Sequence, residues 1–120
     1  MKKGTLYLKP GCTTCRRATA LLASLGADLA MRDIGAEPLT EAEARALIGE
    51  DRPLAPFLGT RSALYRERKM KENPPTRAEA ARLIARDPNL LRRPLLVTSA
   101  GEYVHGLDEA RYREIFSRRG

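Results

Sequence analysis

Residues 5–17 read TLYLKPGCTTCRR and hold the pattern that decides the fold. The first four, Thr5–Leu8, form a short, mostly apolar run that a Pro-Gly pair ends soon after, so they predict a buried strand. Beyond the turn, apolar residues recur at the spacing of one helix face. These residues are Ala18, Leu21, Leu22 and Leu25. The two cysteines, Cys12 and Cys15, therefore lie where a strand passes into a helix.

The middle of the chain predicts a second strand and then helices. Residues 29–34 read as a strand, and the strand–helix–strand order predicts a right-handed unit with parallel strands. Thr40 with Glu43 has the pattern of a capping box, which begins a helix that should run to about residue 48. Residues 62–86 are charged and predicted helical. Pro74-Pro75 divides them, and Thr76 with Glu79 makes a second capping-box pattern.

The C-terminal part predicts a hairpin and a closing helix. Residues 95–98 and 102–105 read as two strands around a turn, and residues 108–116 as a helix. The complete order is β-α-β, a helical block and β-β-α. It predicts an α/β fold of the thioredoxin-like (glutaredoxin-like) type, which has a mixed β-sheet, flanking helices and a helical insertion.

Length and composition indicate one globular domain over residues 1–120. A chain of 120 residues with 42% hydrophobic and 31% charged residues can build one core and is unlike a disordered chain. We expect the core elements in about residues 1–37 and 88–120, and the helical insertion in about residues 38–87. The N-terminus lacks the long apolar run of a secretory signal, and no stretch approaches a membrane span. We expect a cytoplasmic monomer that does not associate with membranes.

The net charge of +7 admits two interpretations. One is a surface for an acidic partner or an anionic substrate. The other, which we favour, is an arginine-rich surface without such a role, because the basic groups are spread along the chain with acidic residues between most of them. We do not expect direct nucleic-acid binding.

The spacing of Cys12 and Cys15 predicts a redox pair. A helix N-terminus favours an anion, so the Cys12 thiol should have a lowered pKa and act as the nucleophile. Cys15, one helical turn later, can attack a mixed disulfide formed at Cys12 and release the substrate. Two inert thiols are an alternative. A zinc site is disfavoured because four ligands are needed and only His105 and scattered carboxylates are available, so no metal is expected.

These residues resemble the arsenate-reductase-like (ArsC/Spx) family of thioredoxin-fold proteins. The resemblance spans nearly the whole chain and rests on residues 7–17, on Thr60-Arg61-Ser62 and on residues 90–94, LLRRP. It implies that Cys12 attacks arsenate or a disulfide. It also implies that Arg61 and Arg93 bind an oxyanion or hold the thiolate. Pro94 matches a proline beside the active site that is usually cis.

The chain departs from true arsenate reductases and is closer to the Spx-type and uncharacterised branch. Arsenate reductases carry a third arginine where Gly106 stands, and a histidine where Leu8 stands. Spx-type members regulate transcription by binding RNA polymerase, and they resemble this chain at both cysteines and at Thr60-Arg61-Ser62. Their polymerase-binding surface includes a glycine that aligns here with Pro53.

Three functions follow from the residues and the resemblance. The first is a thiol-dependent oxidoreductase with a redox-active Cys12–Cys15 disulfide, which acts on a small oxyanion or disulfide without a bound cofactor. Glutathione or a protein thiol would be its reductant. The second is an Spx-like redox-sensing regulator that binds RNA polymerase. The third is an arsenate reductase.

Overall fold

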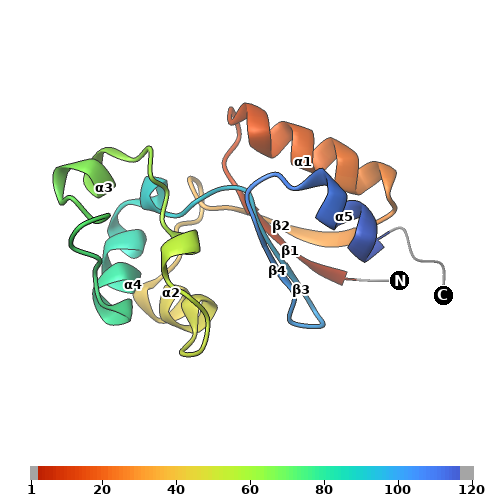
Figure 1. Cartoon of the computed structure of the whole chain (residues 1–120). Coiled ribbons are helices and arrows are strands. Elements are labelled where there is room, and N and C mark those ends of the chain that lie inside the picture. Colours follow the sequence, from red (N-terminus) through yellow and green to blue (C-terminus); the bar gives the residue numbers. More distant parts are fainter. Residues whose placement is uncertain (1–2, 117–120) are drawn as a thin grey trace. The chain divides into compact units, whose positions relative to one another are not determined.

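The structure of the chain, a computed structural model, describes residues 3–116 and divides them between two compact units (Figure 1). The first unit combines residues up to 35 with those from 93 onward, and the second comprises Ala36–Arg92. The predicted insertion, residues 38–87, lies inside the second unit. That the whole chain is one domain stays a prediction.

The first unit is built on a four-stranded mixed sheet in the order β2-β1-β3-β4. These strands are β1 (Lys3–Leu8), β2 (Asp28–Asp33), β3 (Leu95–Thr98) and β4 (Tyr103–His105). The strand β1 pairs in parallel with β2 and antiparallel with β3, and β4 pairs antiparallel with β3. The parallel pair is joined by α1 (Thr13–Ser24), as a crossover between parallel strands requires. The predicted mixed sheet is thus confirmed.

Two helices, α1 and α5 (Glu109–Phe116), lie side by side along this sheet (Figure 1). The sheet and both helices contribute to one core of buried side chains. Its members are Leu6, Ala18, Leu22, Leu96, Val104, Tyr112 and Ile115. The apolar face predicted for α1 thus supplies two of the core side chains. Burial of such side chains is the main force that holds α1, and with it both cysteines, against the sheet.

The second unit is helical and contains α2 (Glu41–Ile48), α3 (Ala63–Glu67) and α4 (Arg77–Arg86), with 3₁₀ turns η1 (Ala55–Phe57) and η2 (Pro88–Leu90). The helices α2 and α4 pack against each other. Thr40 and Glu43 form the complete predicted capping box at the start of α2. At α4 the Thr76 hydroxyl accepts a hydrogen bond of 3.1 Å from the backbone N–H of Glu79, which is one half of the predicted box.

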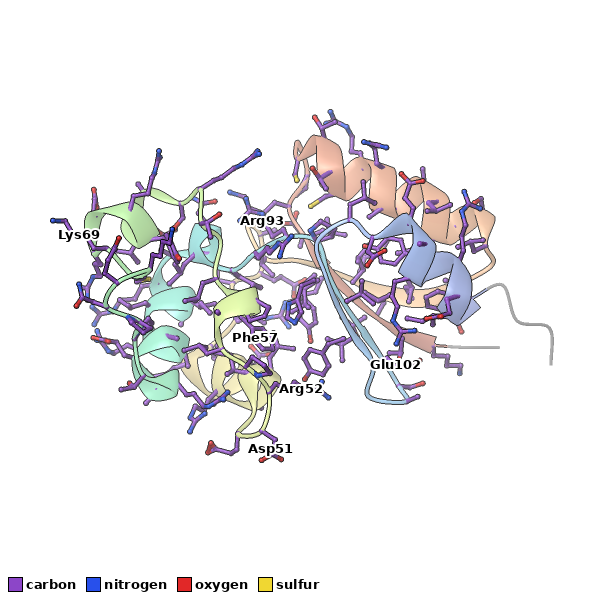
Figure 2. All side chains as sticks on the ribbon, viewed as in Figure 1. Asp51, Arg52, Phe57, Lys69, Arg93 and Glu102 are labelled. Carbon is purple, nitrogen blue, oxygen red and sulfur yellow. The ribbon has the colours of Figure 1, made fainter. Side chains whose placement is uncertain are left out.

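The prediction of helix throughout residues 62–86, apart from a break at Pro74-Pro75, was wrong for residues 68–73, whereas the break at the two prolines and the new helix start at Thr76 are confirmed. The helix α3 ends at Glu67, and the next helix, α4, begins only at Arg77. Lys69 has φ of 51°, in the left-handed region, which stops the helix well before the prolines (Figure 2). The charged composition of this segment gave no indication of that turn.

Within residues 3–116, no helix has the length and apolar character needed to cross a membrane.

Candidate active site

The two cysteines lie together at the start of α1, as predicted. Cys12 is the N-cap residue, and its sulfur accepts a hydrogen bond of 3.3 Å from the backbone N–H of Cys15. This N–H is one of the donors that the first turn of a helix leaves without a helical partner. No acidic residue occupies the first turn. Both cysteines are present as free thiols.

The surroundings of Cys12 favour its thiolate. Partial burial alone would raise the pKa of this thiol. Hydrogen bonds from Cys15 and the positive charge of Arg93 outweigh burial, and the pKa of Cys12 falls below its ordinary value. A lowered pKa increases the fraction of nucleophilic thiolate near neutral pH.

Cys15 has the opposite character. It is only 2% exposed, and burial raises the pKa of its thiol to about 11, although a backbone hydrogen bond to Lys9 and the charge of Arg93 act in the other direction. The negative charge of a Cys12 thiolate contributes to this rise. At neutral pH, therefore, Cys12 is the more ionised and more accessible thiol, and Cys15 holds its proton.

Arg93 and Pro94 belong to the same unit as the cysteines and lead directly into β3 (Figure 2). The Arg93–Pro94 peptide bond is cis, and Pro94 is buried. The backbone N–H of Gly106 donates a hydrogen bond of 2.8 Å to the Pro94 carbonyl. The structure thus brings four of the five residues expected at the site, Cys12, Cys15, Arg93 and Pro94, into one compact unit.

Arg61 belongs to the second unit, where it is exposed just before α3. The neighbouring Ser62 caps α3 by accepting a hydrogen bond of 3.0 Å from the Tyr65 backbone N–H. The Thr60-Arg61-Ser62 motif therefore has a local structural role through its serine. The anion-binding role of Arg61 stays a prediction.

Tyr112 belongs to the first unit, with the cysteines, and its connection to the site was not predicted from the sequence. Its ring is fully buried and its hydroxyl donates a hydrogen bond of 3.0 Å to the carbonyl of Gly106. Burial, reinforced by the charges of Cys15 and Asp108, raises the pKa of Tyr112. The sequence predicted a helix over residues 108–116, which contains Tyr112, but gave no indication of the partner of its hydroxyl.

Gly106 stands where the resemblance places the third arginine of arsenate reductases. This glycine is buried and has φ of 77°, a conformation that side-chain-bearing residues adopt at a cost. Within residues 3–116, no three His, Cys, Asp or Glu side chains gather as a metal site would require.

Comparison with known proteins gives consistent matches over almost the full length. Residues 7–115 match the model of the ArsC family. The global transcriptional regulator Spx of Enterococcus faecalis is 31% identical over 115 residues, which cover 95% of this chain and 86% of that protein.

Comparison with solved structures gives matches of the same kind. The structure of a possible arsenate reductase from Streptococcus mutans is 34% identical, covers 88% of this chain and 92% of its own, and superimposes with a TM-score of 0.72. An arsenate reductase from Vibrio cholerae shares 22% identity and a TM-score of 0.77, with 95% of this chain and 98% of its own covered, a likeness that concerns the fold.

Proposed function

The chain belongs to the ArsC family of thioredoxin-like proteins, and from this premise we propose that it is a cytoplasmic thiol–disulfide redox protein. Cys12 is the nucleophile and Cys15 the resolving thiol. The observation that carries the proposal is the hydrogen bond of 3.3 Å from the Cys15 N–H to the Cys12 sulfur. This bond and Arg93 stabilise negative charge on Cys12, whereas burial keeps Cys15 protonated one helical turn away.

The proposed reaction has two exchange steps. The Cys12 thiolate attacks one sulfur of a substrate disulfide, which forms a mixed disulfide and releases the other substrate half as a thiolate. Cys15 then loses its proton to that thiolate or to water and attacks the Cys12 sulfur. This step forms the Cys12–Cys15 disulfide and releases the remaining half. The substrate disulfide gains two electrons, and the two cysteines lose them.

The protein's own groups account for the order of the steps. Attack starts from Cys12 because its pKa is lowered, whereas burial keeps Cys15 protonated until a mixed disulfide has formed beside it. No bound cofactor is needed. Glutathione or a protein thiol would return the disulfide to two thiols by the same exchange chemistry.

The experiment is reduction of a small aromatic disulfide by purified protein, followed by the absorbance of the released thiol. The Cys15→Ser variant should stop at a mixed disulfide on Cys12 that intact-mass spectrometry detects, and Cys12→Ser should form none. Equal reactivity of the two single variants would contradict the assigned roles.

A second candidate function is redox-controlled regulation through RNA polymerase. It is favoured by the 31% identity to a global transcriptional regulator Spx, over 95% of this chain. In this case the Cys12–Cys15 pair is the switch. Purified protein would be mixed with the RNA polymerase of its source organism, before and after mild oxidation. Binding to the polymerase that changes with oxidation in the unmodified protein, but not in Cys12→Ser, would support this function. Absence of binding in both redox states would reject it.

Reduction of arsenate is the third candidate, and the observation in its favour is the 34% identity to the Streptococcus mutans structure. Of the two arginines that the resemblance assigns to its oxyanion, Arg93 belongs to the same unit as Cys12. Gly106 supplies no charge at the position where the resemblance places a third arginine, so we rank this candidate below the other two.

A further inference from the structure

Gly106 is hydrogen-bonded through both of its main-chain polar groups. Its N–H donates to the carbonyl of Pro94 at 2.8 Å, just beyond the pairing of β3 with β4, and its carbonyl accepts a bond of 3.0 Å from the Tyr112 hydroxyl of α5. Arg93, whose positive charge favours the Cys12 thiolate, is the residue directly before Pro94. A chain of two hydrogen bonds therefore connects Tyr112 with the backbone that carries Arg93.

Tyr112 is suited to hold Gly106 because its own position does not depend on its hydroxyl. The ring is fully buried in the core of the first unit. Its backbone N–H donates a hydrogen bond of 2.9 Å to the Asp108 carbonyl, and the Asp108 carboxylate accepts one of 3.0 Å from the backbone N–H of Arg111. Removing the hydroxyl should therefore delete one hydrogen bond and leave the ring and the start of α5 in place.

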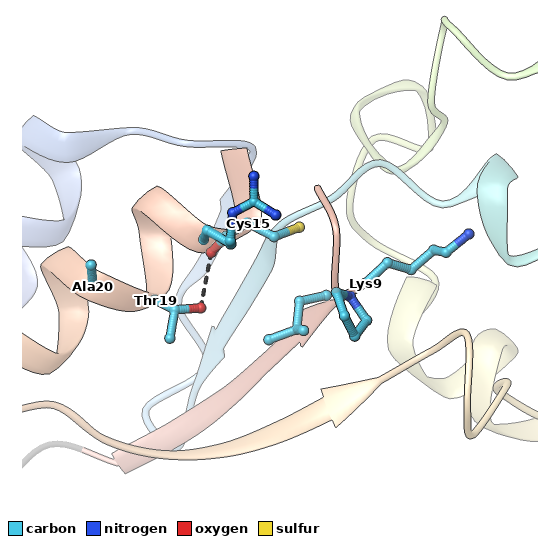
Figure 3. A pocket seen from close by; sticks show the side chains of 7 residues that line it. Lys9, Cys15, Thr19 and Ala20 are labelled. Atoms are coloured by element: carbon cyan, nitrogen blue, oxygen red, sulfur yellow. Dashed lines mark hydrogen bonds between the residues drawn. The ribbon is translucent and has the colours of Figure 1, made fainter. Parts of the chain in front are cut away.

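The two cysteines are held by bonds within α1 that do not involve Tyr112. The N–H of Cys15 donates to the Cys12 sulfur at 3.3 Å, and the Thr19 hydroxyl donates to the Cys15 carbonyl at 2.9 Å (Figure 3). Cys15 also borders a pocket of about 340 Å³ between the end of β1 and α1, and no residue of α5 lines it. The hydrogen bond of Tyr112 is thus linked to the site through the backbone before β3.

We propose that Tyr112 is a positioning residue for Cys12. Its hydroxyl holds Gly106, and Gly106 holds the carbonyl of Pro94. These two bonds keep the adjoining Arg93 at the place from which its charge acts on the Cys12 sulfur. The inference rests on the proposed function, in which Cys12 is the nucleophile, and it adds a residue of the last helix to the groups that set its reactivity.

The test is the pH dependence of Cys12 alkylation in Cys15→Ser protein, with and without Tyr112→Phe. Removing the hydroxyl should raise the midpoint, but by less than Arg93→Ala does, because the arginine keeps its charge and loses only its fixed place. Below the midpoint, each rise of about 0.3 pH units should halve the rate, in proportion to the thiolate fraction. An unchanged midpoint would overturn the proposal.

A direct effect of the hydroxyl on the thiols is the alternative, since the charge of Cys15 contributes to the raised pKa of Tyr112. A double-mutant cycle distinguishes the two. If the hydroxyl acts by positioning Arg93, Tyr112→Phe should shift the midpoint in protein that contains Arg93 and have almost no effect in Arg93→Ala protein. Equal shifts in both backgrounds would overturn the proposal.

The matched control is Ile115→Val, which removes a buried methyl group from the same helix and changes neither hydrogen bond. It should lower stability without moving the midpoint, and a shift as large as that of Tyr112→Phe would overturn the proposal. If Tyr112→Phe fails to fold, ¹⁵N-labelled Cys15→Ser protein decides the matter. Its Gly106 amide should titrate with the Cys12 midpoint, whereas the Gly101 amide in the β3–β4 turn should not. Absence of this titration at Gly106 would overturn the proposal.

The result is separate from that of the proposed function. Reduction of a disulfide needs both cysteines, whereas alkylation needs only Cys12. Protein that reduces no disulfide, but whose midpoint rises with Tyr112→Phe only when Arg93 is present, loses the proposed function and keeps the positioning role. Protein that reduces the disulfide with the same midpoint in both forms keeps the function and loses the positioning role.

Discussion

The hydroxyl of Tyr112 donates a hydrogen bond of 3.0 Å to the backbone carbonyl of Gly106, and both groups are buried. Gly106 in turn donates its N–H to the carbonyl of Pro94 at 2.8 Å. One buried side chain of α5 thus holds the turn that supports the backbone next to Arg93, whose charge lowers the pKa of Cys12.

Replacing Tyr112 by phenylalanine should therefore cost stability. The change keeps the ring but leaves the Gly106 carbonyl without this donor in the interior, so the free energy of unfolding should fall by about 1–3 kcal/mol. Denaturant titration measures it. The control is Tyr65→Phe, at a half-buried tyrosine of the second unit, which should change stability by less than about 0.5 kcal/mol. Equal effects of the two variants would show that the Tyr112 hydrogen bond contributes nothing.

Arg93 should be the side chain whose charge activates Cys12. We expect the alkylation rate of Cys15→Ser protein to rise with pH at a midpoint below the value of a free thiol, about 8.5. Adding Arg93→Ala should move this midpoint upward and slow the reaction at neutral pH. Arg92→Ala is the matched control, since Arg92 is exposed and its backbone N–H, which donates to the Phe57 carbonyl, is kept. Identical midpoints with and without Arg93 would refute the role.

The two cysteines should affect the pH dependence of stability in opposite directions. Burial raises the pKa of Cys15 to about 11, so its thiol stabilises the fold below the unfolded value of about 8.5. This contribution is lost as pH rises toward 11, by at most about 1.4 kcal/mol per pH unit. The pKa of Cys12 is lowered, so its contribution is present above the unfolded value and disappears as pH falls through the folded value.

Urea titration between pH 6 and 11 on single alanine variants separates the two effects. Relative to unmodified protein, Cys15→Ala should lose less stability as pH rises toward 11, and Cys12→Ala should gain less stability as pH rises toward the unfolded thiol pKa of about 8.5. Parallel curves for all three proteins would contradict both assignments.

Mild oxidation should join Cys12 and Cys15 in a reversible disulfide. The thiols begin one helical turn apart, with the Cys15 N–H on the Cys12 sulfur, so little backbone movement is needed. Alkylation and mass spectrometry should count two blocked thiols in reduced protein and none after oxidation, with full recovery on reduction. Persistence of two free thiols in folded protein under oxidising conditions would eliminate the proposed redox pair.

Arsenate turnover with glutathione and glutaredoxin should be low, because a missing arginine–oxyanion contact is worth about 1.5–3 kcal/mol. Replacing Gly106 by that arginine should itself reduce the stability of the protein. Gly106 has φ of 77° and is buried, so Gly106→Arg should destabilise the protein by at least about 1–2 kcal/mol. Comparing the thermal unfolding of Gly106→Arg with that of Gly101→Arg separates the effect of backbone strain from that of burial. Gly101 also has a positive φ, but it has open space around it. Robust arsenate turnover by the unmodified protein would instead make arsenate reduction the leading function.

The sequence by itself determined the features that local chemistry dictates. The apolar run before Cys12 and the helical spacing after it were enough to predict β1, α1 and the position of both thiols at the helix start. The capping box of Thr40 and Glu43 involves residues three apart, so its geometry follows from adjacent sequence. The wrong prediction of helix over residues 68–73 shows the limit of such reasoning, since composition does not reveal a left-handed residue such as Lys69.

The tertiary structure alone decided which distant groups act on the thiols. The charge of Arg93 reaches Cys12 because β3 pairs with β1, which brings Arg93, two residues before β3, near the start of α1. Tyr112 reaches Gly106 only because α5 packs on the sheet, and the pocket beside Cys15 exists only where α1 crosses the end of β1. These relations depend on burial and strand pairing between segments far apart in the chain, which no local pattern of residues encodes.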